Sequence, residues 1–308
     1  MLTSFFSISK PINFIIVSVF LLFGYSLWIF LNPIEALSLS FFINYILIAL
    51  VFIFLILLLD FIVRKNSLTD KNNLSIILFC CFILLFPAVF SENNIIISNL
   101  FLLLALRRIV SITSVKNTNK KLLDATLFIT IASLFYFWSL LYFIVLYIGI
   151  LQNPKKTANH FLIPIVGFLS VFTLTTTYYL LMNDSFFWFL KIDRSIGIDF
   201  SAYQSFSLLI PASIIIALTI WTLFYRISKF STIAKKAKSN YTLLILVLVI
   251  SFLIGFLSST KNGAEFFFVL ASLSIITTSY IEGIKEFWFK ELLLWVLVLL
   301  PIGLMFIN

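Results

Sequence analysis

Long apolar runs recur from one end of the chain to the other, and short polar segments separate them. Most runs hold about 17 to 23 residues, and a helix of roughly 20 residues crosses the ~30 Å hydrocarbon core of a bilayer. A further run, 95–115, is interrupted by Arg107 and Arg108, whose long side chains can reach an interface. The pattern predicts an all-α protein, a polytopic transmembrane helical bundle. The uninterrupted runs are 12–32, 41–63, 74–90, 161–182, 206–225, 241–258, 265–281 and 291–307.

The apolar stretch 122–152 has two interpretations. It contains no proline, and its only glycine is Gly149, so no residue type marks an obvious break. A single helix of this length would measure about 46 Å, which is too long to cross without a strong tilt. A helical hairpin would turn near Tyr136–Ser139, with Ser139 capping the second helix. The hairpin gives about 11 membrane helices, and a single crossing gives about 10.

The basic residues favour the hairpin, because Lys and Arg in the short loops of membrane proteins lie preferentially on the cytoplasmic side. With the N-terminus inside and a hairpin at 122–152, only Lys191, Arg194 and Lys261 of the 21 basic residues lie outside. A single crossing would place nine of them outside. We therefore predict a multi-pass protein of the bacterial inner (cytoplasmic) membrane, with a cytoplasmic N-terminus and a periplasmic C-terminus.

Composition excludes a soluble protein, because 62% of the residues are hydrophobic and only 11% are charged. We expect residues 1–308 to form a single integral-membrane domain without a separate soluble domain. The chain has one histidine, His160, and its two cysteines, Cys80 and Cys81, are adjacent within an apolar run. Histidine-rich metal sites and His-based catalytic triads therefore lack their residues. We expect membrane lipids as partners, and no metal, cofactor or nucleic acid.

Six charged residues in the predicted outward loops are candidates for a functional site. Glu265 begins a predicted helix, whose N-terminal dipole favours a negative charge. Lys191 and Arg194 follow SFFWFL, an aromatic sequence typical of a segment that lies along a membrane interface. We expect all six to lie at one membrane face, around a shared cavity. The candidate catalytic residues are Glu35, Glu92 and Glu265, and the candidate ligands of a lipid phosphate are Lys191, Arg194 and Lys261.

About sixty residues from Glu92 onward contain SENN, a span ending in LLLALRR, a basic loop and the paired segments LLDATLFITIASLFYFWSLLYFIVLYIGIL. This order resembles the integral-membrane glycosyltransferases of the GT-C class, which use polyprenyl-phosphate sugars. The resemblance implies a polyprenyl-phosphate lipid as partner and implies that Glu35 acts as a base or metal ligand. The first outward loop departs from that class, since it has only about eight residues and one carboxylate. The chain also resembles the uncharacterised polytopic membrane families common in Bacteroidota, a likeness that implies no activity.

Three functions are compatible with this pattern. We favour a non-catalytic inner-membrane protein, a subunit or assembly factor of an envelope complex, with other inner-membrane or envelope proteins as partners. The first alternative is a GT-C-like enzyme that uses a polyprenyl-phosphate-linked sugar. The second is a transporter or flippase for a lipid or small neutral solute. No acidic or basic residue lies at the centre of a clear span, which argues against a proton-coupled pump or an ion channel.

Overall fold

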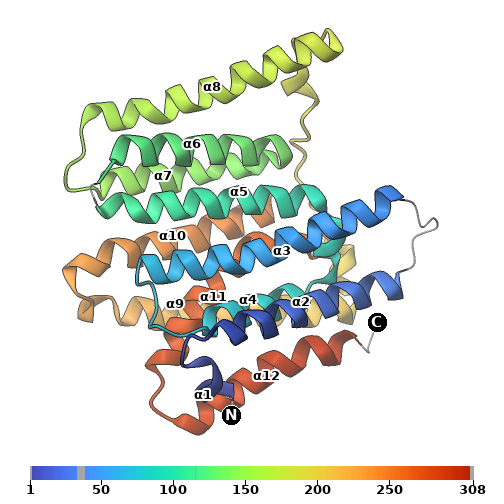
Figure 1. Ribbon diagram of the computed structural model, residues 1–308, viewed down its shortest axis with the longest axis vertical. Helices are drawn as coiled ribbons and strands as arrows, with labels where there is room; N and C mark the ends of the chain where they lie inside the picture. Colours follow the sequence, from blue (N-terminus) through green and yellow to red (C-terminus); the bar gives the residue numbers. More distant parts are fainter. Residues whose placement is uncertain (1, 33–38, 115, 306–308) are drawn as a thin grey trace. The chain divides into compact units, whose positions relative to one another are not determined.

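A computed structural model describes residues 2–32, 39–114 and 116–305, which form helices joined by loops and no strands (Figure 1). Contacts divide the chain into two compact units. Unit 1 comprises residues 1–93, 199–233 and 261–308, and unit 2 comprises residues 94–198 and 234–260. The prediction of a single membrane domain stays a prediction.

Two buried helices, α4 and α11, form the centre of unit 1. Every residue of α4 is buried, and almost every residue of α11 is buried as well. Helices α2, α3 and α12 pack on α4, α9 packs on α11, and α1 packs on α12. The buried hydroxyls of Ser272, Ser274 and Thr278 donate to carbonyl groups one turn earlier in α11, so they need no outside partner. The bounds are α1 Leu2–Phe6, α2 Pro11–Leu31, α3 Leu39–Lys65, α4 Leu74–Leu84, η1 Pro87–Ser91, η5 Ser201–Gln204, α9 Phe206–Ser228, η6 Phe230–Thr232, η7 Ala264–Phe266, α11 Phe267–Gly283 and α12 Phe287–Met305.

In unit 2, α6 packs on α8 and on α7, and α7 packs on α10. Glycines permit two of the close approaches. A Cβ atom on Gly167 of α8 would lie 2.8 Å from Cγ2 of Thr126 of α6, and one on Gly149 of α7 would lie 3.1 Å from Cγ2 of Ile109 of α5. Small residues at such contacts are typical of helix packing in membranes. The bounds are α5 Asn93–Val110, η2 Ser111–Ser114, α6 Thr118–Phe135, η3 Phe137–Leu141, α7 Tyr142–Leu151, α8 Ala158–Asn183, η4 Trp188–Lys191 and α10 Lys235–Phe256.

Eight helices in the described part of the chain are long and apolar enough to cross a membrane. The prediction of a multi-pass, all-helical protein is therefore confirmed, whereas the count of about 11 membrane helices stays a prediction. The predicted span 74–90 is not one helix, because α4 ends at Leu84 and the 3₁₀ turn η1 begins at Pro87. Proline disfavours helical geometry in the residue before it, and Phe86 has φ −125° and ψ 75°.

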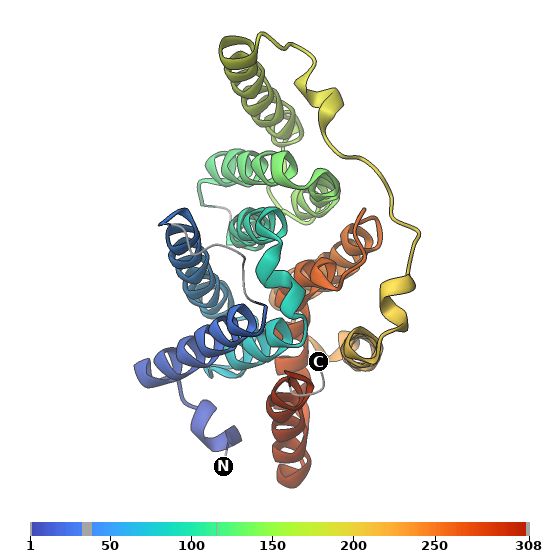
Figure 2. The same cartoon turned by 90° about the vertical axis from the view of Figure 1, so that its right-hand side faces the viewer.

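The stretch 122–152 forms two helical segments that pack against each other, as the hairpin interpretation predicted. Tyr136 is extended, with φ −145° and ψ 105°, and it separates α6 from η3 and α7. Figure 2 shows the two arms side by side in green. The predicted capping role of Ser139 is wrong, since its Oγ lies 2.7 Å from Oγ of Ser98 in α5. Ser98 also donates to the carbonyl of Ala132, so this hydroxyl pair ties the turn to α5.

Candidate functional site

The segment that leads into α11 contains a tight, buried turn in unit 1. Gly263 has a φ of +93°, a left-handed conformation that glycine adopts without strain. A Cβ atom at this position would also lie 2.9 Å from Cδ2 of Leu208 and 3.1 Å from Cδ1 of Phe86. The ring of Phe86 stacks on that of Phe266, with centroids 4.7 Å apart. The turn at Gly263 therefore lies beside the stacked rings of Phe86 and Phe266.

The carboxylate of Glu265 is the centre of this turn. Its side chain is only 4% exposed. Oε1 accepts a hydrogen bond from the hydroxyl of Tyr203 at 2.6 Å, and Oε2 accepts one from the backbone N–H of Gly263 at 2.8 Å. Burial raises the pKa of the Tyr203 hydroxyl, and the adjacent charge of Glu265 raises it further, so the phenol keeps the proton that it donates. Glu265 therefore joins η5 to the start of α11.

Two more of the predicted residues, Glu92 and Lys261, belong to the same cluster. Oε1 of Glu92 accepts a hydrogen bond from Nδ2 of Asn262 at 3.0 Å, while Oδ1 of Asn262 accepts one from the N–H of Ala264 at 3.1 Å. Lys261 is 8% exposed, and its Nζ lies 5.4 Å from the ring centroid of Phe200. Burial lowers the pKa of Lys261, and the charge of Glu265 opposes that shift.

The hydrogen bonds of Glu265 with Tyr203 and Gly263, together with that of Glu92 with Asn262, hold the turn in place, and we call this set of contacts the lock. Both carboxylate oxygens of Glu265 are engaged by donors from the turn and from η5, and Glu92 is tied to the same turn through Asn262. Each oxygen of Glu265 thus directs one lone pair at a protein donor, Tyr203 or Gly263. The residues that the structure describes contain no group of three or more His, Cys, Asp or Glu side chains arranged to hold a metal ion.

The structure does not connect the other three predicted site residues with this cluster. Lys191 and Arg194 belong to unit 2, whereas Lys261 belongs to unit 1, and Glu35 lies outside the described residues. Nη2 of Arg194 donates to the carbonyl of Phe189 at 2.6 Å, and its Cζ lies 5.3 Å from the ring centroid of Phe137. Lys191 is exposed at the end of η4.

A second polar cluster lies at the opposite end of α11, and none of its residues is among the predicted site residues. Asp60 and Arg64, four residues apart in α3, pair at 2.7 Å, and Nη2 of Arg64 also donates to Oδ1 of Asn73 at 2.8 Å. Nδ2 of Asn72 donates to Oε1 of Glu282 at 2.6 Å. The adjacent asparagines before an apolar run were the available signal, because buried amides need partners.

Comparison with known protein families gives a match that covers nearly the whole chain. A model for a family of unknown function, DUF6427, matches residues 5–308 of the chain. No curated protein and no solved structure matches it.

Proposed function

Because the chain belongs to the DUF6427 family, whose function is unknown, we propose from its geometry that it is a non-catalytic membrane protein. Its role is that of a subunit or assembly factor of an envelope complex in the bacterial inner membrane. The observation that carries this proposal is the lock at Glu265, in which both carboxylate oxygens accept hydrogen bonds from the protein itself. Glu265, one of the three candidate catalytic carboxylates, thus holds a loop, and a subunit or assembly factor needs such rigid packing rather than a reactive carboxylate.

The enzymatic alternative makes a different demand on the same residues. A GT-C-like transferase acting on a polyprenyl-phosphate sugar would need Glu35, Glu92 or Glu265 to take a proton or bind a metal. Glutamine keeps the size of each side chain but removes the charge and the basic oxygen, so it separates the two functions.

The test uses Glu35→Gln and Glu92→Gln in a strain that lacks the chromosomal gene. We expect both variants to complement the deletion as the wild type does, and to retain the same membrane-protein partner in near-stoichiometric amount after purification in mild detergent. Loss of complementation by Glu35→Gln at normal protein level would establish a catalytic role. A wild-type protein that purifies alone would contradict the proposed complex.

The topology that accompanies this proposal gives its own prediction. Residues 153–158, which lead from the loop after α7 to the first residue of α8, should lie in the cytoplasm, because the hairpin returns the chain to the side on which α6 begins. A periplasm-active reporter fused there should be silent, and a cytoplasm-active one should work. The same pair of reporters fused within residues 192–198 should give the reverse pattern. Strong periplasmic activity at 153–158 would contradict the hairpin topology, and every later segment would then have the opposite orientation in the membrane.

A lipid-binding role is the second candidate, and the surface around η4 favours it. Phe186, Phe187 and Leu190 are exposed beside the exposed Lys191. Exposed aromatic and aliphatic side chains next to basic groups are typical of segments that lie in the headgroup region.

We expect Lys191→Ala combined with Arg194→Ala to weaken retention of a polyprenyl-phosphate or phospholipid ligand in native mass spectrometry. The loss arises because charge-assisted contacts to phosphate are removed. Melting of the variant should match that of the wild type within a few degrees, which separates a binding effect from unfolding. Equal lipid retention by the variant and the wild type would rule out a lipid site at Lys191 and Arg194.

A further inference from the structure

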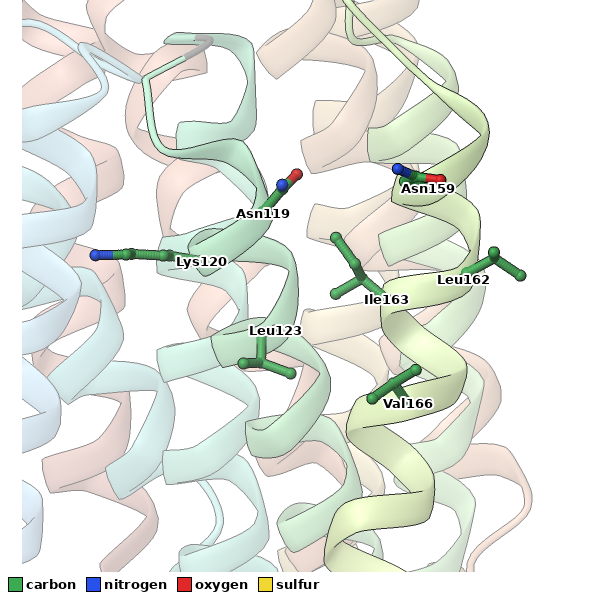
Figure 3. A pocket seen from close by; sticks show the side chains of 7 residues that line it. All are labelled: Asn119, Lys120, Leu123, Asn159, Leu162, Ile163 and Val166. Atoms are coloured by element: carbon green, nitrogen blue, oxygen red, sulfur yellow. The ribbon is translucent and has the colours of Figure 1, made fainter.

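A groove with an apolar body and a polar mouth lies between α6 and α8 of unit 2. Its volume is about 460 Å³, and it is lined by Asn119, Lys120, Leu123, Asn159, Leu162, Ile163 and Val166 (Figure 3). Asn119 belongs to the first turn of α6 and Asn159 to the first turn of α8, so both helices begin at the same end of the groove. Figure 3 shows the two amides facing each other across this end, while Ile163 points from α8 toward α6 below them.

The body of the groove is aliphatic and open to its surroundings. Leu123 is 39% exposed, Leu162 is 57% exposed and Val166 is 60% exposed. Helix α8 is one of the helices long and apolar enough to cross a membrane, so in a bilayer Leu162 and Val166 would face hydrocarbon rather than water. Val166 is the last residue of α8 that lines the groove, and the next residue, Gly167, packs closely on Thr126 of α6. An acyl chain is the ligand that fills such a groove without burying a polar group.

The mouth of the groove carries the opposite chemistry. The amides of Asn119 and Asn159 supply N–H donors, and Lys120 adds a positive charge, although Figure 3 shows its side chain extended away from the two amides. The nearest carboxylate along α6, that of Asp124, pairs with Arg108 at 2.8 Å. Further lysines in the segments that precede the two helices are Lys116, Lys155 and Lys156. This excess of positive charge suits an anionic group at the mouth.

We propose that the α6–α8 groove binds one anionic phospholipid of the bilayer. Its phosphate lies between Asn119 and Asn159, within reach of Lys120 once that exposed side chain rotates. One acyl chain follows Leu123, Ile163 and Val166 toward Gly167. The proposal is independent of the function proposed above, since it requires neither a partner protein nor catalysis.

The test compares phosphatidylglycerol with phosphatidylcholine of identical acyl chains, bound to the detergent-purified protein and measured by native mass spectrometry. The Lys191→Ala, Arg194→Ala variant is the background, so that the other candidate lipid site does not contribute. We expect phosphatidylglycerol to bind about tenfold more tightly than phosphatidylcholine. Inorganic phosphate at millimolar concentration should not displace it, since the acyl chain supplies much of the affinity. Displacement by phosphate would show a plain anion site and overturn the lipid assignment.

Variants of the mouth and the body separate the two parts of the site. Asn119→Ala with Lys120→Ala and Asn159→Ala should abolish the preference for phosphatidylglycerol, and Val166→Trp should reduce binding of both lipids about tenfold by filling the groove. Leu169→Trp is the matched control, because Leu169 is exposed on α8 and does not line the groove. The proposal is wrong if Val166→Trp and Leu169→Trp bind lipid equally, or if the wild type does not distinguish the two lipids.

Discussion

Replacing Glu265 with alanine is expected to lower the free energy of unfolding by about 3 kcal/mol. The substitution leaves the hydroxyl of Tyr203 and the N–H of Gly263 without the acceptor that each has now. A buried donor that loses its partner costs about 1–3 kcal/mol; this applies in full to the N–H of Gly263 and in part to the half-buried hydroxyl of Tyr203. The loop before α11 and the turn η5 should loosen together, since this carboxylate is bonded to both.

Unfolding of the purified protein in detergent, followed by tryptophan fluorescence against temperature and against denaturant, measures the effect. Tyr203→Phe should cost about 1–2 kcal/mol, and the double variant should cost less than the sum of the two single variants, because the residues share one hydrogen bond. Glu286→Ala is the matched control, since Glu286 is exposed and should shift stability by less than about 0.5 kcal/mol. A Glu265→Ala protein as stable as this control would show that the lock does not hold the loop.

The lock also marks how far the candidate site was predictable. The sequence alone indicated that Glu92, Lys261 and Glu265 lie in loops of one membrane face, and the structure joins all three to one turn of unit 1. The sequence did not indicate Tyr203, which precedes Glu265 by 62 positions and meets it only through the packing of η5 on this turn. The partner of a buried carboxylate is decided by tertiary contacts, and no local pattern encodes those.

The fold was predictable where a physical rule acts locally. Apolar length identified the long spans, and the distribution of Lys and Arg favoured a hairpin that the structure contains at 122–152. Apolar length alone did not give the extent of α4, because the apolar run continues through Pro87 whereas the helix ends at Leu84. The predicted helix cap at Ser139 was also wrong. Its hydroxyl contacts that of Ser98, 41 positions earlier, instead of capping its own helix.

The close contact of α6 with α8 gives the second large effect. Gly167→Ala is expected to destabilise the protein by about 1–3 kcal/mol, the usual cost of overpacking. The added Cβ would lie 2.9 Å from Cβ of Thr126, an atom fixed to the backbone, so that rotating the Thr126 side chain cannot relieve the clash. Gly167→Leu should cost more, and it should separate the two helices that form the walls of the groove.

A compensating change tests the geometry rather than mere sensitivity of α8 to substitution. Thr126→Gly removes the atoms that the new Cβ would meet, so Gly167→Ala should cost less in the Thr126→Gly background than in the wild type. Gly303→Ala is the matched control, because no atom lies within 4 Å of a Cβ built there. Alanine at that helical position should leave stability unchanged or raise it by up to about 1 kcal/mol. If Gly167→Ala costs the same in both backgrounds, the helices do not meet at this pair, and the end of the proposed lipid groove lies elsewhere.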